Sequence, residues 1–248
     1  MICKLCLQNK PLLKKSHIIP DFMHQGLFDQ THALHKIDLN DFKKSVKLYN
    51  GEYESNILCA NCDNNIIGQY ENYASIILYG GKLSKSEDIT FQNRRNIHGV
   101  ELTYCKGIDY TKFKLFLLSV LWRSSISKRE FFRNVSLGPY EDKIREMILN
   151  SDPGEPLDFP CFISTYKNIK DLPDGFIGQP KKYRTGNILG HTFFIEGFVY
   201  IFLISKIKKP DWLSEVAINK DNEMSIVHMN RENAKELINH FMQAKLVK

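Results

Sequence analysis

The stretch Asn56-Ile57-Leu58-Cys59-Ala60-Asn61-Cys62-Asp63 places two cysteines directly before a segment whose apolar residues have helical spacing. A second pair of the same form, Cys3-Lys4-Leu5-Cys6, lies at the N-terminus. A two-residue gap lets both sulfurs of a tight turn reach one ion, and two such turns complete a tetrahedral zinc shell. The predicted zinc ligands are Cys3, Cys6, Cys59 and Cys62.

The remaining cysteines do not suggest a disulfide framework. Six cysteines in 248 residues is a low density for a disulfide-stapled secreted protein. Cys105 and Cys161 stand alone in apolar surroundings, which is typical of buried cysteines. A redox function for the pairs would require a βαβ context, which the flanking sequence lacks. Four thiolates leave no open position for water, so the predicted zinc is structural and any chemistry must come from other residues.

The chain has no predicted membrane span, because its longest apolar runs are interrupted by Lys114 or Glu196. A cysteine pair stands where a signal peptide would begin, so we expect a cytoplasmic protein. The net charge of +6 favours a polyanionic partner, and residues 1–50 hold eight basic and four acidic residues. Basic and aromatic residues also combine at 181–184 and around Trp212, where three lysines lie at 206, 208 and 209.

The sequence divides at the polar stretch 80–88. Residues 1–79 form one predicted unit, closed by a helix with Ile66, Tyr70, Tyr73 and Ile77 on one face. Residues 90–248 form the second unit, which we expect to choose the substrate, bind a partner or regulate the first. The predicted fold class is α+β, with a small treble-clef zinc domain followed by a larger α+β domain that contains an antiparallel sheet.

Periodicity predicts the elements of the larger unit. We expect helices around 113–121 and 140–148, and a final helix over 231–246 capped by Asn230. The expected strands are 100–104, 159–166, 192–204 with a turn at Glu196-Gly197, 214–219 and 224–229.

One candidate catalytic residue lies between the cysteine pairs. His17 ends a predicted strand in Lys14-Lys15-Ser16-His17-Ile18-Ile19-Pro20. An unprotonated imidazole near neutral pH can accept a proton from water that attacks phosphorus. The simpler alternative is a buried histidine that bonds a backbone carbonyl.

These segments together resemble the zinc-stabilised branch of the HNH, or ββα-metal, endonucleases. That family combines a Cys-x-x-Cys, an Asp-His followed by apolar residues and proline, and an Asn-Leu-x-x-Leu-Cys-x-x-Cys-(His/Asn) segment that enters a helix. The matching stretches here are 3–6, 16–20 and 54–63, and the resemblance covers about 60 residues.

The resemblance implies a fold, a reaction and a set of site residues. It implies a nuclease that hydrolyses phosphodiester bonds, with DNA as the default substrate and antiviral defence or a mobile element as the context. His17 falls at the general base, and Asp63 falls at the helix-borne ligand of a catalytic Mg²⁺ or Mn²⁺. Asn56 has the residue type that orients the histidine ring, although strict spacing places Glu54 there.

One departure weakens the match, because Ser16 replaces the acidic residue that normally precedes the histidine. Asp63, which replaces the family's histidine or asparagine, would restore that negative charge. We expect Glu71 to lie on a solvated helix face and Arg123 to cap the C-terminus of its helix. Two other functions stay open. The chain would be a non-catalytic zinc module that binds nucleic acid, or an adaptor in which the zinc unit only stabilises a protein interface. A protein partner or a second copy of the chain would bind through the C-terminal domain.

Overall fold

The structure is a computed structural model that describes residues 1–27, 34–38, 41–48, 53–79, 89–167, 169–170, 172, 176–185, 187–205 and 211–243. The lysines at 206, 208 and 209, the boundary at 80–88 and the last residues of the expected final helix lie outside these ranges. Within the described ranges, no helix combines the length and the apolar character needed to cross a bilayer.

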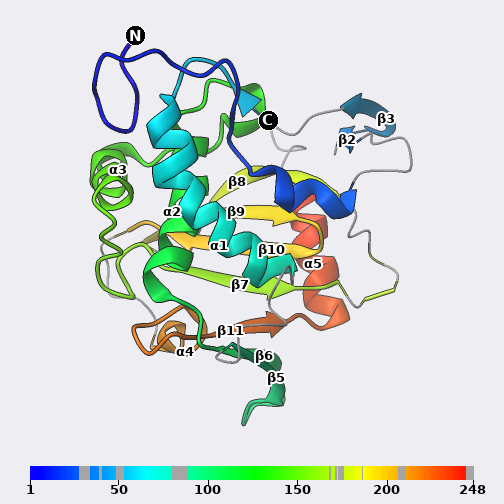
Figure 1. Cartoon of the computed structure of the whole chain (residues 1–248). Coiled ribbons are helices and arrows are strands. Elements are labelled where there is room, and N and C mark those ends of the chain that lie inside the picture. Colours follow the sequence, from blue (N-terminus) through cyan, green and yellow to red (C-terminus); the bar gives the residue numbers. More distant parts are fainter. Residues whose placement is uncertain are drawn as a thin grey trace.

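A seven-stranded sheet forms the centre of the molecule (Figure 1). Its strands are β5 (Thr90–Arg95), β6 (Glu101–Lys106), β7 (Cys161–Thr165), β8 (Ile177–Thr185), β9 (Ile188–Ile195), β10 (Phe198–Leu203) and β11 (Glu223–His228). The spatial order is β5-β6-β11-β7-β10-β9-β8. Neighbouring strands are antiparallel, except that β11 and β7 are parallel.

Helices cover both faces of this sheet. They are α1 (Gly68–Tyr79), α2 (Tyr110–Ile126), α3 (Glu141–Leu149), α4 (Leu213–Val216) and α5 (Arg231–Gln243). Phe193 of β9 packs in the same core as α1, α2 and α3, whereas its neighbour Phe194 packs in a second core with Ala234 and Ile238 of α5. Successive strand residues point to opposite faces. The α1–α3 layer and α5 therefore lie on opposite sides of the sheet, as Figure 1 shows.

The central helix α2 is buried on all sides. The Asp109 side chain caps it by accepting a hydrogen bond from the Lys112 N–H, and every residue from Phe113 to Ser124 is buried. A helix that is apolar all round must be surrounded by other elements. It contacts both α1 and α3. Its two buried charged residues, Lys114 and Arg123, must therefore find partners inside the protein.

The N-terminal residues add short paired segments to this core. β1 (Ser16–His17) pairs antiparallel with β4 (Tyr53–Glu54), and β2 (Leu34–Asp38) pairs antiparallel with β3 (Asp41–Leu48). A π-helical segment, Asn61–Ile67, leads into α1. Ile19 and Tyr70 pack in one continuous core with residues of α2 and the sheet. The division into two domains stays a prediction.

The α+β class and most of the expected elements are confirmed. The turn at residues 196–197 separates β9 from β10, and the Asn230 side chain caps α5 by accepting from the Asn233 N–H at 2.8 Å. The expected strand at 214–219 is wrong, because its first residues form α4 and place Leu213 and Val216 in a small core. Edge strands β5 and β8 were not predicted. β5 is exposed along its whole length and so shows no alternation, and β8 contains Pro180, which only an edge strand tolerates well.

Candidate functional site

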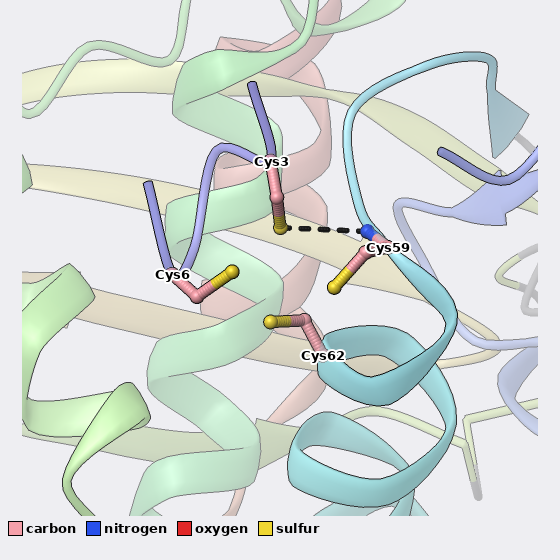
Figure 2. A group of neighbouring side chains, drawn as sticks. All are labelled: Cys3, Cys6, Cys59 and Cys62. Atoms are coloured by element: carbon pink, nitrogen blue, oxygen red, sulfur yellow. Dashed lines mark hydrogen bonds between the residues drawn. The ribbon is translucent and has the colours of Figure 1, made fainter. Parts of the chain in front are cut away.

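The four predicted zinc ligands lie together (Figure 2). The sulfur atoms of Cys3, Cys6, Cys59 and Cys62 all lie within 4.8 Å of one another. Figure 2 shows the first pair on the N-terminal loop and the second pair where the chain enters its helix, with all four sulfurs pointing toward a common centre. This four-cysteine cluster could hold a zinc ion, as the spacing of the pairs predicts.

The surroundings of the cysteines suit a cation. Burial raises the pKa of the Cys3 thiol, but hydrogen bonds from the backbone at Cys6, Cys59 and Leu5 outweigh it and lower the pKa to about 7. Burial and the neighbouring thiols raise the pKa of Cys62 far above its ordinary value. Four sulfurs this close cannot all ionise without a cation to neutralise them. Zinc would supply that charge.

Backbone pairing holds the two cysteine turns against each other. The Cys59 N–H lies 3.4 Å from the Cys3 sulfur, and the Lys4 N–H donates to the Ile57 carbonyl at 2.9 Å. Arg145 of α3 donates from Nη1 to the carbonyl of Leu5 at 3.1 Å. A helix far along the chain therefore supports the first turn.

His17 lies on the short ribbon formed by β1 and β4. Its side chain is 34% exposed, and its Nε2 lies 3.1 Å from the Asp21 carboxylate. The ring is therefore not buried, and its ring-nitrogen contact among the described residues is with a carboxylate, in contrast to the simpler alternative of a bond to a backbone carbonyl. The contact also identifies Asp21, which no sequence signal had singled out, as the side chain that meets the imidazole.

Asp63 follows Cys62 in the π-helical segment, where the Gly68 N–H donates five residues back to the Asp63 carbonyl. Such segments are rare and frequently occur at functional sites. Burial raises the pKa of the Asp63 carboxyl, while Arg123 lowers it and Glu71 raises it. Ser16 and His17 lower it further. Asp63 and His17 therefore belong to one electrostatic cluster.

Ser16 adds a buried polar atom to this cluster. It is fully buried, and among the described residues its hydroxyl oxygen makes no hydrogen bond of ordinary geometry. Buried polar groups usually have a partner. The neighbour of this hydroxyl is the Asp63 carboxyl, because an interaction with the Ser16 side chain lowers the pKa of that carboxyl.

Glu71 and Arg123 correct two of our expectations. The Glu71 side chain is only 23% exposed, and its Oε1 lies 2.6 Å from Nη2 of the fully buried Arg123. It therefore does not lie on a solvated helix face. Arg123 does not cap α2, because its Nη1 donates to the His17 carbonyl at 2.6 Å. One feature of the sequence could have indicated that Arg123 points inward, namely that it is a charged residue on a mostly apolar helix.

Among the described residues, neither Asn56 nor Glu54 has a hydrogen bond to His17, although Glu54 pairs with Ser16 in the ribbon. Asn56 is exposed and has a left-handed backbone with φ of 61°, a conformation that asparagine tolerates. Its side chain has no hydrogen-bond partner among the described residues, so nothing here ties it to His17. The Glu54 carboxylate accepts from the Ser127 hydroxyl at 2.6 Å and the Lys128 N–H at 2.9 Å. It therefore fastens β4 to the end of α2.

Comparison with known proteins gives no match. No family model, no curated protein and no solved structure is significantly similar to this chain. The chemistry of the site must therefore be argued from its own residues.

Proposed function

We propose that this chain is a metal-dependent endonuclease of the HNH type that hydrolyses phosphodiester bonds, with DNA as its default substrate. One observation carries the proposal. A partly exposed histidine with a carboxylate on its Nε2 shares an electrostatic cluster with a half-buried aspartate, next to a four-cysteine cluster suited to zinc. In this proposal the cysteine turns, the β1–β4 ribbon and the helix after Cys62 form a treble-clef ββα-metal unit.

His17 would act as the general base. A carboxylate accepts from an N–H, so the contact with Asp21 assigns the proton of the neutral ring to Nε2. The lone pair of Nδ1 then remains to take a proton from the attacking water. Asp21 would orient the ring, which is the function that the family pattern assigned to the position of Asn56 or Glu54.

Asp63 would hold a divalent cation, with the buried Ser16 hydroxyl beside it. Carboxylate and hydroxyl oxygens suit Mg²⁺ or Mn²⁺. When bound, such an ion would neutralise charge that develops on the phosphate and the leaving oxygen. The residues from 90 onward would select the substrate, bind a partner or regulate cleavage.

A non-catalytic zinc module that binds nucleic acid is the second candidate, and one feature favours it. The buried guanidinium of Arg123 lies within electrostatic reach of Asp63. In the family pattern, an acidic residue stands at the position that Ser16 has here. Like charges repel, so the guanidinium weakens the attraction of Asp63 for a cation.

A cleavage assay separates the two functions. Purified protein is incubated with supercoiled DNA, linear DNA and RNA in the presence of Mg²⁺, Mn²⁺ or a slight excess of EDTA, and the zinc content is measured afterwards. We expect metal-dependent cleavage that His17→Ala slows by about 100-fold or more, the lower limit of general-base catalysis.

The control is His98→Ala, which removes an exposed histidine from the turn between β5 and β6. Figure 1 places this hairpin and the N-terminal loop at opposite ends of the molecule. Cleavage that survives in His17→Ala would overturn the mechanism. Tight binding without cleavage by the wild-type protein would favour the second candidate.

A further inference from the structure

The two edges of the central sheet differ in how they are protected. An edge strand presents unpaired backbone groups to other chains, and proteins commonly block it with proline, lysine or a break in the pairing register. The edge strand β8 has all of these features, because it contains Pro180, Lys181 and Lys182 and its register shifts between Gly178 and Lys181. The opposite edge strand, β5, pairs with β6 in one continuous register and contains neither proline nor lysine. The sequence of β5 therefore does not block its edge in these ways.

The two arginines of β5 have their partners on β6. The Arg95 guanidinium lies 2.6 Å from the Glu101 carboxylate. The Arg94 guanidinium carbon lies 3.9 Å from the centre of the Tyr104 ring. Both charges are thus held against the neighbouring strand, and the Arg95 charge is neutralised there. They do not stand in the way of a further strand beside β5.

The hydrogen bonds of the β5–β6 hairpin show which backbone groups of β5 face outward. The Asn96 N–H donates to the Val100 carbonyl at 2.9 Å, next to the turn of the hairpin. Residues that exchange backbone hydrogen bonds alternate along an antiparallel pair. The odd-numbered residues Phe91, Asn93 and Arg95 therefore direct their N–H and carbonyl groups away from β6. Among the residues that the structure describes, no strand pairs with these groups, because β5 is the last strand of the sheet.

The outward residues are complementary to a second copy of the same strand. Consider an antiparallel pair of β5 strands with a two-fold axis through Asn93. Phe91 of each copy then lies opposite Arg95 of the other, and all three outward residues exchange backbone hydrogen bonds. An arginine beside an aromatic ring is a favourable pair. Moving the axis to Arg94 or to Arg95 would place two arginines opposite each other, and like charges there are destabilising. Charge thus favours pairing about Asn93.

Exposed apolar side chains accompany this edge. Phe91 is 45% exposed, and Ile97, in the hairpin turn, is 95% exposed. The turn is held in place by the Asn96 side chain, which accepts hydrogen bonds from two backbone N–H groups of the turn. In pairing about Asn93, Ile97 of one copy lies beside the start of β5 in the other, where Ile89 packs against the core. A second copy would therefore cover apolar surface that the single chain exposes.

We propose that this chain forms a homodimer in which the β5 strands of two copies pair antiparallel about Asn93 and join the two sheets into one. The proposal does not depend on the proposed nuclease function, because it rests on the sheet edge and not on His17. Figure 1 places the hairpin and the N-terminal loop at opposite ends of the molecule, so the two candidate sites lie at the far ends of the dimer. Pairing through one short strand buries little surface, so the dimer is a weak one.

Charge exchange at Phe91 tests the pairing. Sedimentation velocity of the zinc-loaded protein, over a range of concentrations, gives the dissociation constant of the dimer. Phe91→Lys and Phe91→Glu remove the same ring, but the first places a cation opposite Arg95 and the second an anion. Each pair occurs twice in the dimer. We therefore expect the dissociation constant of Phe91→Lys to exceed that of Phe91→Glu by about tenfold or more.

The matched control changes charge on the other edge of the sheet. Lys182→Glu on β8 exchanges the same two residue types at an exposed position and should leave the dissociation constant unchanged. Zinc content and thermal unfolding identify any variant that fails to fold. Equal dissociation constants for the two Phe91 variants would overturn the proposal. An equally large effect of Lys182→Glu would also overturn it, because net charge alone would then explain the result.

Amide hydrogen exchange of the wild-type protein, followed by NMR, tests the register without any substitution. The N–H groups of Phe91, Asn93 and Arg95 should become protected as the protein concentration rises. Those of Gln92 and Arg94, which bond to β6, should be protected at every concentration. A protein that stays monomeric, or a dimer without this added protection, would overturn the proposal. Protection of the outward groups at every concentration would also overturn it, because another part of the same chain would then cover the edge.

Discussion

Arg123 donates a hydrogen bond from Nη1 to the backbone carbonyl of His17 at 2.6 Å, across 106 positions of sequence. The same guanidinium pairs with Glu71 through Nη2. Just beyond the end of the same helix, the Ser127 hydroxyl and the Lys128 N–H hold Glu54 on the partner strand. The C-terminal end of α2 therefore holds both strands of the ribbon that carries His17.

Loss of Arg123 should destabilise the fold strongly. Arg123→Met leaves the His17 carbonyl and the Glu71 carboxylate without their partner, and breaking a buried ion pair costs about 3–5 kcal/mol. The exposed part of Glu71 places the expected loss at the lower end of that range. Urea unfolding of the zinc-loaded protein gives the value.

Two further variants test this explanation. Arg123→Lys keeps the charge but not the planar fork, so its loss should be intermediate. The double variant Arg123→Met/Glu71→Met should lose less than the sum of the single changes, because the two groups interact. Additive losses, or a loss below about 1 kcal/mol for Arg123→Met, would contradict a structural role for the pair.

Zinc should be required for the N-terminal residues to fold. We expect about one zinc per chain from the chemistry of the four thiolates, and loss of that zinc in Cys59→Ser with a lower unfolding temperature. Metal analysis and the thiolate charge-transfer bands of the Co²⁺-substituted protein check both points. Cys105→Ala is the control, because Cys105 is buried but lies outside the cluster. Zinc content that is the same in both variants would rule out the four-cysteine site.

Lys114 should make stability depend on pH. Burial lowers the pKa of its ammonium to about 7, although carboxylates such as Asp158 and Glu155 raise it. The folded state then binds fewer protons than the unfolded state between about pH 7 and the ordinary lysine pKa. Stability should therefore rise with pH across this window, by up to about 1.4 kcal/mol per unit from this group.

The comparison is between wild type and Lys114→Met. Urea unfolding across the window from about pH 6 to about pH 10 gives the slope of stability against pH for each protein. The slope should be smaller in the variant, and the difference between the two slopes should vanish below the folded pKa. Parallel curves throughout would show that Lys114 is charged in the folded protein.

The fragment 1–79 should not fold well on its own, even with zinc. Ile19 and Tyr70 pack in the same core as Phe116 of α2 and Ile163 of β7, so removal of residues 80–248 exposes them. The fragment should bind zinc yet show poor dispersion in an NMR spectrum and aggregate at high concentration. A well-dispersed spectrum would instead establish residues 1–79 as an independent domain.

Local patterns anticipated much of the fold. The spacing of the cysteine pairs predicted the four-cysteine cluster, because a two-residue gap restricts where both sulfurs can point. Asn230 predicted the start of α5, because its side chain satisfies the N–H of a residue three positions on. The apolar residues at helical spacing predicted the helix around 113–121, which is α2 in the structure. These features depend on neighbours within a few residues, so they can be found without tertiary structure.

The candidate site was only partly predictable. His17 and Asp63 came from their positions beside the cysteines, and the structure places them in one electrostatic cluster. The sequence motif around the cysteines did not predict which other side chains contact this cluster. Asp21 reaches the His17 ring from a neighbouring turn, while Glu71 is brought inward where α1 meets α2. The strand predicted at 214–219 is wrong at its start, where α4 places Leu213 and Val216 in a small core.

The sequence by itself determined the four-cysteine cluster and the choice of His17 as candidate base, because both depend on residue types at short, fixed spacings. Only the tertiary structure decided what surrounds them. Arg123 lies 106 positions from His17, and Arg129 reaches from beyond the end of α2 to the ribbon whose tyrosine it covers. Such contacts form because burial of an apolar helix places its few charged residues next to residues that are distant in sequence. A local sequence pattern does not contain this information.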